Sequence, residues 1–187
     1  MIKIGEQIPD LEAEVYQNYE IKKVKLSQYR GKWLVLAFYP ADFTFVCPTE
    51  LEDLANNYTH FKNENAEIIS ISTDTAYVHL AWHNDSPAIG KVNYPMMADP
   101  TGRICRTFGT YIEDEGLSQR ATLIIDPDGI LKAMDIHDNS IGRTAKEILR
   151  KLQAASYVRE NPGMVCPANW QKGDEAMDKS LDKVGKI

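Results

Sequence analysis

The run KWLVLAFYP, residues 32–40, constrains the fold of this chain more than any other segment. It is apolar without alternation from Trp33 to Tyr39, and Pro40 ends it. Such a run is typical of a strand buried on both faces of a sheet, because a half-exposed strand alternates polar and apolar side chains. The run is far shorter than the ~18 residues that a membrane-spanning helix needs. We therefore expect a sheet with helices on both faces.

Helical and strand patterns alternate along the rest of the chain. Helices are predicted within residues 48–66, 75–85 and 101–109, and a second buried strand over 67–73. Residues 120–136 predict a β-hairpin, because two β-rich runs flank the turn sequence Asp-Pro-Asp-Gly. An amphipathic helix within residues 143–158 follows. This order predicts an α/β, thioredoxin-like fold with a central mixed sheet flanked by helices.

The regular pattern ends near Asn161. Residues 161–187 are too polar for a core and too short for a domain, so we expect an extended C-terminal tail after one domain over residues 1–160. The net charge of −6 and the pI of about 5.2 argue against nucleic acid or an anionic membrane as the main partner. The start, MIKIGEQIPD, lacks the basic and apolar regions of a secretory signal, which favours a soluble cytoplasmic protein.

The loop after the first buried strand, within FYPADFTFVCPTE, places a lone cysteine beside a proline. Because proline is tolerated only in the first turn of a helix, Pro48 predicts a helix that starts just before it, with Thr44 as the N-cap. Cys47 then lies in the first turn, where free N–H groups and the positive end of the helix dipole favour a thiolate. Position 50 is Glu50, so the thiol has no C-x-x-C partner. The alternative is a small buried side chain without reactivity.

A lone accessible thiolate suits attack on a peroxide, because a second thiol can trap the resulting sulfenic acid. Cys166, in NPGMVCPANW, is flanked by turn-forming residues and is expected to be exposed, as that trap or as an incidental surface thiol. Cys105 lies beside Ile104 and Phe108, and we expect it to pack in the core. Three scattered cysteines are too few for a secreted disulfide framework.

His79 and His83 stand four positions apart on a predicted helix, which is the spacing of a metal-binding pair. The glutamate of an H-E-x-x-H motif is missing, since position 80 is Leu80, and no third ligand is evident. We therefore interpret the two histidines as part of a solvated helix face, and we expect neither a metal nor a bound cofactor.

Several segments resemble the signatures of a known family. FYPADFTFVCPTE resembles the P-x-x-x-T-x-x-C signature of peroxiredoxins, and GMVCPANW resembles the resolving-cysteine segment of the typical two-cysteine class. EDEGLSQRATLIIDPDG and the closing SLDKVGKI resemble the bacterial alkyl hydroperoxide reductase C branch. The resemblance covers essentially the whole chain, with the motifs in the expected order.

The resemblance implies a thiol peroxidase that reduces hydrogen peroxide and organic hydroperoxides in antioxidant defence. Cys47 would be the peroxidatic thiol, and its sulfenic acid would form an intersubunit disulfide with Cys166 of the partner subunit. Thr44 would donate a hydrogen bond to the peroxide, Pro40 would shield the thiol from water, and Arg120 would be the stabilising cation. Glu50 and Arg143 would belong to the surrounding hydrogen-bond network.

The resemblance also implies partners. They are a second copy in a homodimer, a decameric ring of five dimers joined near residues 75–78, and a disulfide reductase, either a flavoprotein alkyl hydroperoxide reductase or thioredoxin. It implies resistance to overoxidation, because the chain lacks the Gly-Gly-Leu-Gly loop and the C-terminal Tyr-Phe pair of easily overoxidised members. Two alternatives stay open: a thiol–disulfide oxidoreductase of the same fold, which the missing C-x-x-C disfavours, and a ring that holds misfolded clients.

Overall fold

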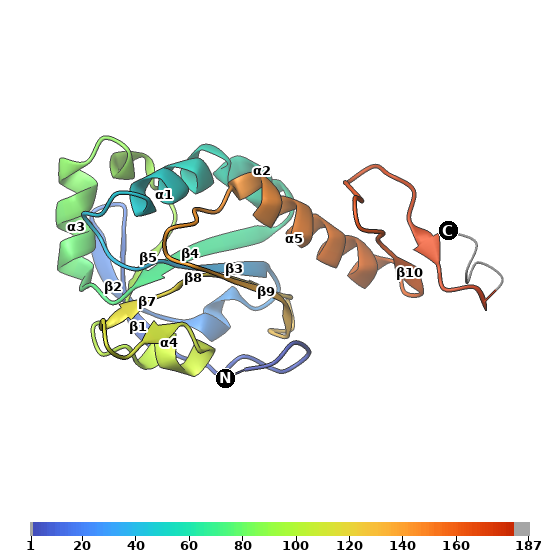
Figure 1. Ribbon diagram of the computed structural model, residues 1–187, viewed down its shortest axis with the longest axis horizontal. Coiled ribbons are helices and arrows are strands. Elements are labelled where there is room, and N and C mark those ends of the chain that lie inside the picture. Colours follow the sequence, from blue (N-terminus) through green and yellow to red (C-terminus); the bar gives the residue numbers. More distant parts are fainter. Residues whose placement is uncertain (1, 182–187) are drawn as a thin grey trace.

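The computed structural model describes residues 2–181 and is built on one seven-stranded sheet (Figure 1). Parallel pairs join its three central strands β5, β4 and β3, and all its other pairs are antiparallel. The predicted α/β fold with a central mixed sheet is therefore confirmed. In sheet order the strands are β2 (Glu20–Lys25), β1 (Glu12–Gln17), β5 (Met96–Ala98), β4 (Ala66–Ser72), β3 (Trp33–Phe38), β8 (Arg120–Ile125) and β9 (Leu131–His137).

Helices cover both faces of the sheet, as predicted (Figure 1). On one face lie α1 (Cys47–Asn56), α2 (Tyr58–Asn63), α3 (Ala76–Asp85), α5 (Ala145–Glu160) and the 3-10 helix η2 (Ile89–Lys91). On the other lie α4 (Arg103–Phe108) and the 3-10 helix η1 (Leu26–Tyr29). Two short strand pairs lie outside the sheet: β6 (Tyr111–Ile112) with β7 (Leu117–Ser118), and β10 (Met164–Val165) with β11 (Met177–Asp178).

Every residue of β3 is buried, as the apolar run predicts. Val35 and Ala37 face the layer below α1, α3 and α5, whereas Leu34 and Leu36 face the layer below α4. Full burial of a valine or leucine side chain contributes about 1.5–3 kcal/mol, so a polar residue in place of Leu34, Val35 or Leu36 would be costly. The strand ends directly before the loop that leads to Cys47, at the carboxyl edge of the parallel strands.

Two parts of the core domain differ from the prediction. β1 buries only Val15 and Tyr16, and β2 buries only Val24 among mostly charged side chains, so the sequence shows no clear strand pattern there. The helix predicted within residues 48–66 is split at Asn57 into α1 and α2. The Asn57 amide donates to the Asp53 carbonyl (2.8 Å), and such local side-chain bonds compete with a continuous helix.

The tail is more ordered than its polar composition suggests. It contains the β10–β11 pair, and Trp170 is only 2% exposed. Residues 182–187, which make up most of the closing SLDKVGKI motif, lie outside the described residues. Within residues 2–181, no helix combines the length and apolarity needed to cross a bilayer.

Candidate active site

Cys47 is the first residue of α1, and Pro48 is the second. The predicted position of the thiol in the first helical turn is therefore confirmed, because a proline without an N–H fits there and not further along. The predicted N-cap is wrong: Val46 occupies that position and makes no side-chain cap. Thr44 instead donates its hydroxyl to the Ala41 carbonyl (2.9 Å), which stabilises the loop before the helix.

The Cys47 side chain is fully buried, whereas an accessible thiol was expected. It packs in the same apolar layer as Tyr39 and Leu51, because the loop turns the start of α1 onto the sheet. A polar group reaches the sulfur, because Arg120 Nη1 lies 3.3 Å from Cys47 Sγ. Arg120 is the first residue of β8, and antiparallel pairing of β8 with β3 fixes it beside the loop. The thiol is thus shielded from bulk water and faces a permanent cation.

Glu50, one turn along α1, holds two arginines in place. Its Oε2 lies 2.7 Å from Arg120 Nη1, and its Oε1 lies 2.9 Å from Arg143 Nε and accepts the Arg143 backbone N–H at 2.8 Å. All three side chains are almost completely buried. Burial raises the pKa of Glu50, but the hydrogen bonds and charge of Arg143, together with the charge of Arg120, outweigh it and lower that pKa overall. Glu50 is therefore ionised at neutral pH.

Arg120 and Arg143 are also fixed by backbone atoms. Arg120 Nε donates to the Asn139 carbonyl (2.9 Å), and the Asn139 side chain accepts the Arg120 backbone N–H (3.1 Å). Arg143 Nη1 donates to the Ala121 carbonyl (2.6 Å). Asn139 was missed by sequence reasoning; it follows β9 in an ordinary turn, and only the pairing of β8 with β9 brings it beside Arg120.

These contacts bring together four of the residues implied for the site: Cys47, Arg120, Glu50 and Arg143. Pro40 is buried shortly after β3, and Thr44 is partly buried three residues before Cys47. A guanidinium beside a sulfur in a site closed to water stabilises a thiolate and any negative charge that develops near it. The arrangement suits nucleophilic attack by sulfur on a small electrophile.

His79 belongs to a buried polar network, so the expected solvated face is wrong for this residue. Its Nδ1 lies 2.7 Å from Asp42 Oδ2, and neither side chain has exposed surface. The Tyr39 hydroxyl donates to the other Asp42 oxygen (2.7 Å). The three-residue spacing of Ala76, His79 and Trp82 in α3 turns them all toward the core, and this spacing was a signal in the sequence.

This network anchors the loop between β3 and α1 to helix α3. Burial raises the pKa of Asp42, and the hydrogen bond and charge of His79 oppose that rise only in part. His83, one turn further along α3, is partly buried, with its Nε2 3.3 Å from the Val92 carbonyl oxygen. Across residues 2–181, no three His, Cys, Asp or Glu side chains lie close enough together to hold a metal ion.

The other two cysteines have different surroundings. Cys105 is fully buried in α4, as predicted, and burial, followed by the charge of Asp99, raises its pKa to about 12. Cys166 directly follows β10 in the tail and is half-buried. Burial also raises the pKa of Cys166, although the charge of Arg150 opposes this. In Figure 1 the tail and the start of α1 lie at opposite ends of the molecule.

Fold and site together define a thioredoxin-like thiol enzyme, in which a single cysteine at a helix start faces an arginine. Residues 4–134 match the model of the AhpC/TSA family, and residues 156–186 match the model described as the C-terminal domain of 1-Cys peroxiredoxin. The chain belongs to the AhpC/TSA family of peroxiredoxins.

Individual relatives agree with this membership. Alkyl hydroperoxide reductase C of Amphibacillus xylanus is 47% identical over 188 residues, which is 100% of both chains. The crystal structure of Enterococcus faecalis AhpC is 44% identical, with a TM-score of 0.86 over 89% of this chain and 100% of that chain. The reduced 2-Cys peroxiredoxin of Plasmodium vivax is 36% identical, with a TM-score of 0.91 over 96% of this chain and 94% of that chain.

Proposed function

We propose that this chain reduces hydrogen peroxide and organic hydroperoxides, with Cys47 as the nucleophile. The observation that carries the proposal is the 3.3 Å contact between Arg120 Nη1 and the buried sulfur of Cys47. The Cys47 thiolate attacks the terminal peroxide oxygen, the O–O bond breaks, and the departing oxygen takes a proton and leaves as water or an alcohol. Cys47 is then a sulfenic acid.

The surrounding residues act on charge and water. Arg120 stabilises the thiolate and the charge that develops on the departing oxygen, because guanidinium stays charged and offers several donors. Glu50 and Arg143 hold Arg120 in place. Thr44 donates a hydrogen bond to the peroxide, and to do so its hydroxyl turns away from the Ala41 carbonyl. Pro40 shields the sulfur from water.

We further propose that Cys166 of the partner subunit resolves the sulfenic acid. The separation of the tail from the start of α1 in one chain supports an intersubunit reaction (Figure 1). The resulting disulfide is reduced by an external disulfide reductase, either a flavoprotein alkyl hydroperoxide reductase or thioredoxin. In this proposal residues 1–160 carry the nucleophile and residues 161–187 carry the resolving thiol. Free cysteines suit the reducing cytoplasm, which we propose as the location.

Peroxide consumption by purified protein with dithiothreitol as the electron donor tests the activity. The wild type should turn over, Cys47→Ser should not, and Cys105→Ser serves as a matched control because its thiol is buried on the other face of the sheet. Full turnover by the Cys47→Ser protein would contradict the proposal. Adding each candidate reductase with NAD(P)H then identifies the physiological donor.

We propose that the dimers assemble into a decameric ring through the segment around Thr75 to Val78. The exposure of Tyr77 (69%) supports a contact there, since a large side chain at the start of α3 is left without cover in one chain. Sedimentation velocity of the reduced protein should give a species near ten chains. A dimer at all concentrations would contradict the ring without touching the peroxidase chemistry.

A further inference from the structure

Trp170 is almost completely buried although it lies in a mostly exposed tail. Its ring packs against Tyr157 of α5, with ring centroids 5.1 Å apart. Its carbonyl oxygen accepts a hydrogen bond from Arg150 Nη1 (3.3 Å), and its indole N–H donates to the Asp174 carbonyl (3.1 Å). A tryptophan that is buried and has its N–H satisfied is a strong anchor. The tail is therefore fixed to α5 of its own chain at this point.

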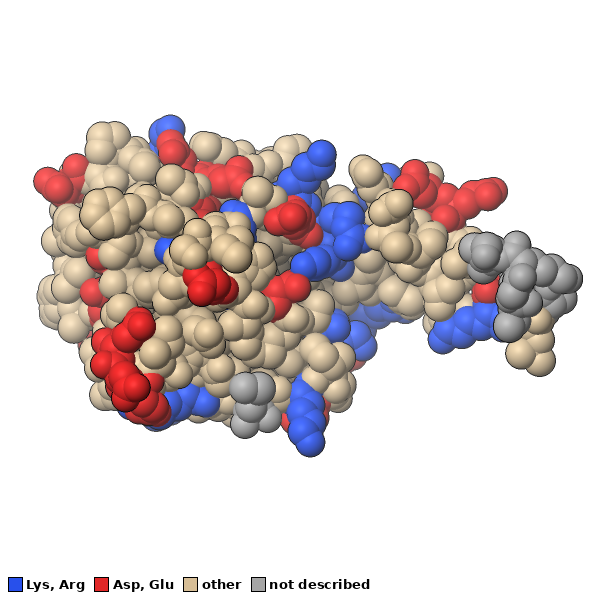
Figure 2. All heavy atoms as spheres, viewed as in Figure 1, with Lys and Arg blue, Asp and Glu red and all other residues tan. Residues whose placement is uncertain are grey.

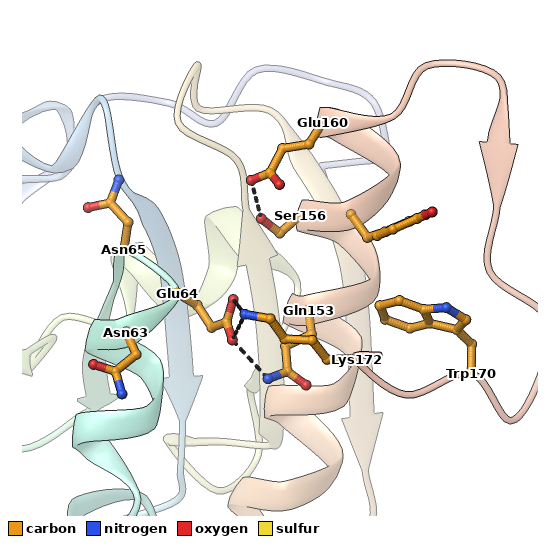
Figure 3. Close-up of a pocket in the computed structure, with 9 residues that line it drawn as sticks. Asn63, Glu64, Asn65, Gln153, Ser156, Glu160, Trp170 and Lys172 are labelled. Atoms are coloured by element: carbon orange, nitrogen blue, oxygen red, sulfur yellow. Dashed lines mark hydrogen bonds and ion pairs between the residues drawn. The ribbon is translucent and has the colours of Figure 1, made fainter. Parts of the chain in front are cut away.

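A second anchor follows two residues later. Glu64 directly follows α2, and its Oε1 lies 2.8 Å from Lys172 Nζ. The same oxygen accepts a hydrogen bond from Gln153 of α5 (2.9 Å). Figure 3 shows these three side chains meeting close to the Trp170 ring. The Glu64 side chain is only 11% exposed, so this ion pair is shielded from solvent on one side. The tail is thus held by both α2 and α5.

The two anchors close a short loop around Cys166. The chain leaves α5 at Glu160 and is fixed again at Trp170. Between these points lies β10, which pairs with β11 on the other side of Trp170. A free chain of n residues spreads over about 5–6 Å × √n, so Cys166, six positions beyond Glu160, would otherwise range over roughly 12–15 Å. In the anchored loop Cys166 is half-buried, with its Sγ 3.9 Å from the Ala154 carbonyl oxygen.

Cys166 opens onto a hollow with positive charge on its rim. Figure 2 shows Lys and Arg side chains gathered over α5, where the tail joins the body of the molecule. The charge of Arg150 opposes the rise that burial causes in the pKa of Cys166, so this cation favours the thiolate without reversing that rise. The hollow around Cys166 is lined by basic and small apolar side chains that include Lys132, Arg150, Lys151, Ala154 and Val158.

We propose that Trp170 is a positioning residue for Cys166, and the proposal rests on the peroxidase function given above. Trp170 holds loop 161–170 on α5 so that Cys166 meets the Cys47 sulfenic acid of a second copy of the chain. In that step a sulfur electron pair of Cys166 attacks the Cys47 sulfur. The S–S bond forms, the S–O bond breaks, and hydroxide leaves with the Cys166 proton as water. The anchor raises the effective concentration of the thiol and acts only after peroxide has been reduced.

Single-turnover oxidation with limiting peroxide separates the two steps. A dimedone adduct reports the Cys47 sulfenic acid, and non-reducing electrophoresis of quenched samples reports the disulfide. In Trp170→Ala we expect disulfide formation to slow by at least about tenfold, while sulfenic acid forms within about twofold of the wild-type rate. Trp170→Phe keeps the ring contact with Tyr157 and should restore most of the rate.

Glu64→Gln weakens the second anchor, the pair with Lys172, from the folded body and leaves the tail sequence unchanged. It should also slow only the second step. Glu113→Gln is its matched control, since Glu113 pairs with Arg106 of α4, away from the tail. Hydrogen exchange over residues 162–169 needs no turnover, and it should speed up in Trp170→Ala and in Glu64→Gln but not in the control.

Three outcomes would overturn the inference: wild-type disulfide formation in Trp170→Ala, equal slowing of both steps in Trp170→Ala and Glu64→Gln, or unchanged hydrogen exchange in both variants. A wild-type protein that forms no sulfenic acid would instead remove the proposed function, and the exchange measurement would still report whether Trp170 anchors the loop.

Discussion

Replacing Glu50 by Gln removes one buried charge while keeping the shape of the side chain. The carboxylate accepts four hydrogen bonds, three from Arg143 and one from Arg120. An amide has one acceptor oxygen, and its NH₂ group would face a guanidinium donor on the other side. Breaking a buried ion pair from one side costs about 3–5 kcal/mol, because the partner charge stays buried. At about 2–4 °C per kcal/mol for a domain of this size, Tm should fall by roughly 6–20 °C.

The same substitution should slow the reaction with peroxide. Arg120 Nη1 contacts both Glu50 and the Cys47 sulfur, so a displaced guanidinium no longer faces the thiol. Losing one donor that stabilises developing charge costs about 10²–10³-fold in rate, and we expect a loss of this size for Cys47 oxidation. The assays are calorimetry for Tm and stopped-flow oxidation by peroxide. Glu52→Gln, on the same helix, is the matched control, because its pair with Lys91 lies at the surface.

Acid provides a further check on Glu50. Burial raises its pKa, but Arg143 and Arg120 lower it overall, so the stabilisation from its charge is present above the pKa of an unfolded glutamate. That stabilisation is lost as the pH falls through the lower pKa of the folded state. The Tm difference between wild type and Glu50→Gln should therefore shrink in strong acid. A variant that melts and reacts like the wild type at neutral pH would refute the reasoning.

Three more predictions concern the cysteines. Cys166→Ser should abolish the dimer band on non-reducing electrophoresis after about one equivalent of peroxide, and a persistent band would contradict the pairing. Cys47 should show little sulfinic acid by mass spectrometry at sub-millimolar peroxide with excess reductant, because the chain has EDEGLSQR where easily overoxidised peroxiredoxins carry a Gly-Gly-Leu-Gly loop that helps to lock the first turn of α1; substantial sulfinic acid would mean that another feature locks this turn. Cys105, whose pKa burial raises to about 12, should resist iodoacetamide at about pH 8 until the protein is denatured, and rapid labelling of the folded protein would show that α4 opens.

The start of α1 could be predicted from local chemistry, but its cap could not. Pro48 has one favourable place in a helix, and this fixed the position of Cys47. Thr44 has the right side chain for an N-cap, yet Phe43 adopts a left-handed conformation with φ 55° that turns the chain early. The Thr44 hydroxyl is then used within the loop, and Val46 begins the helix uncapped. Loop geometry of this kind depends on packing against the sheet, which a local pattern does not contain.

The arginines of the site show the same limit more strongly. Arg120 is 70 positions from Glu50, and Arg143 is 93 positions from it, so no local spacing links them. Resemblance to a family supplied these residues, and the sheet topology explains how they meet. His79 is different, because its three-residue spacing with Ala76 and Trp82 is itself a local sign of a buried helix face. The prediction weighed the histidines only as a metal-binding pair or as part of a solvated face, and it did not use this spacing.

The position of Glu50 one turn into α1 decides how far that helix can come apart. Cys47 has to leave its buried site before its sulfur can meet another chain. Near it, the backbone bonds from the N–H groups of Thr49 and Glu50 to the Val46 carbonyl, at 3.0 and 3.3 Å, are the first to break. Unwinding beyond this turn would break the ion pairs that the Glu50 carboxylate makes with Arg120 and Arg143. In the proposed reaction, unwinding of α1 is therefore confined to the residues before Glu50, and the ion pairs of Glu50 keep the rest of the helix in place.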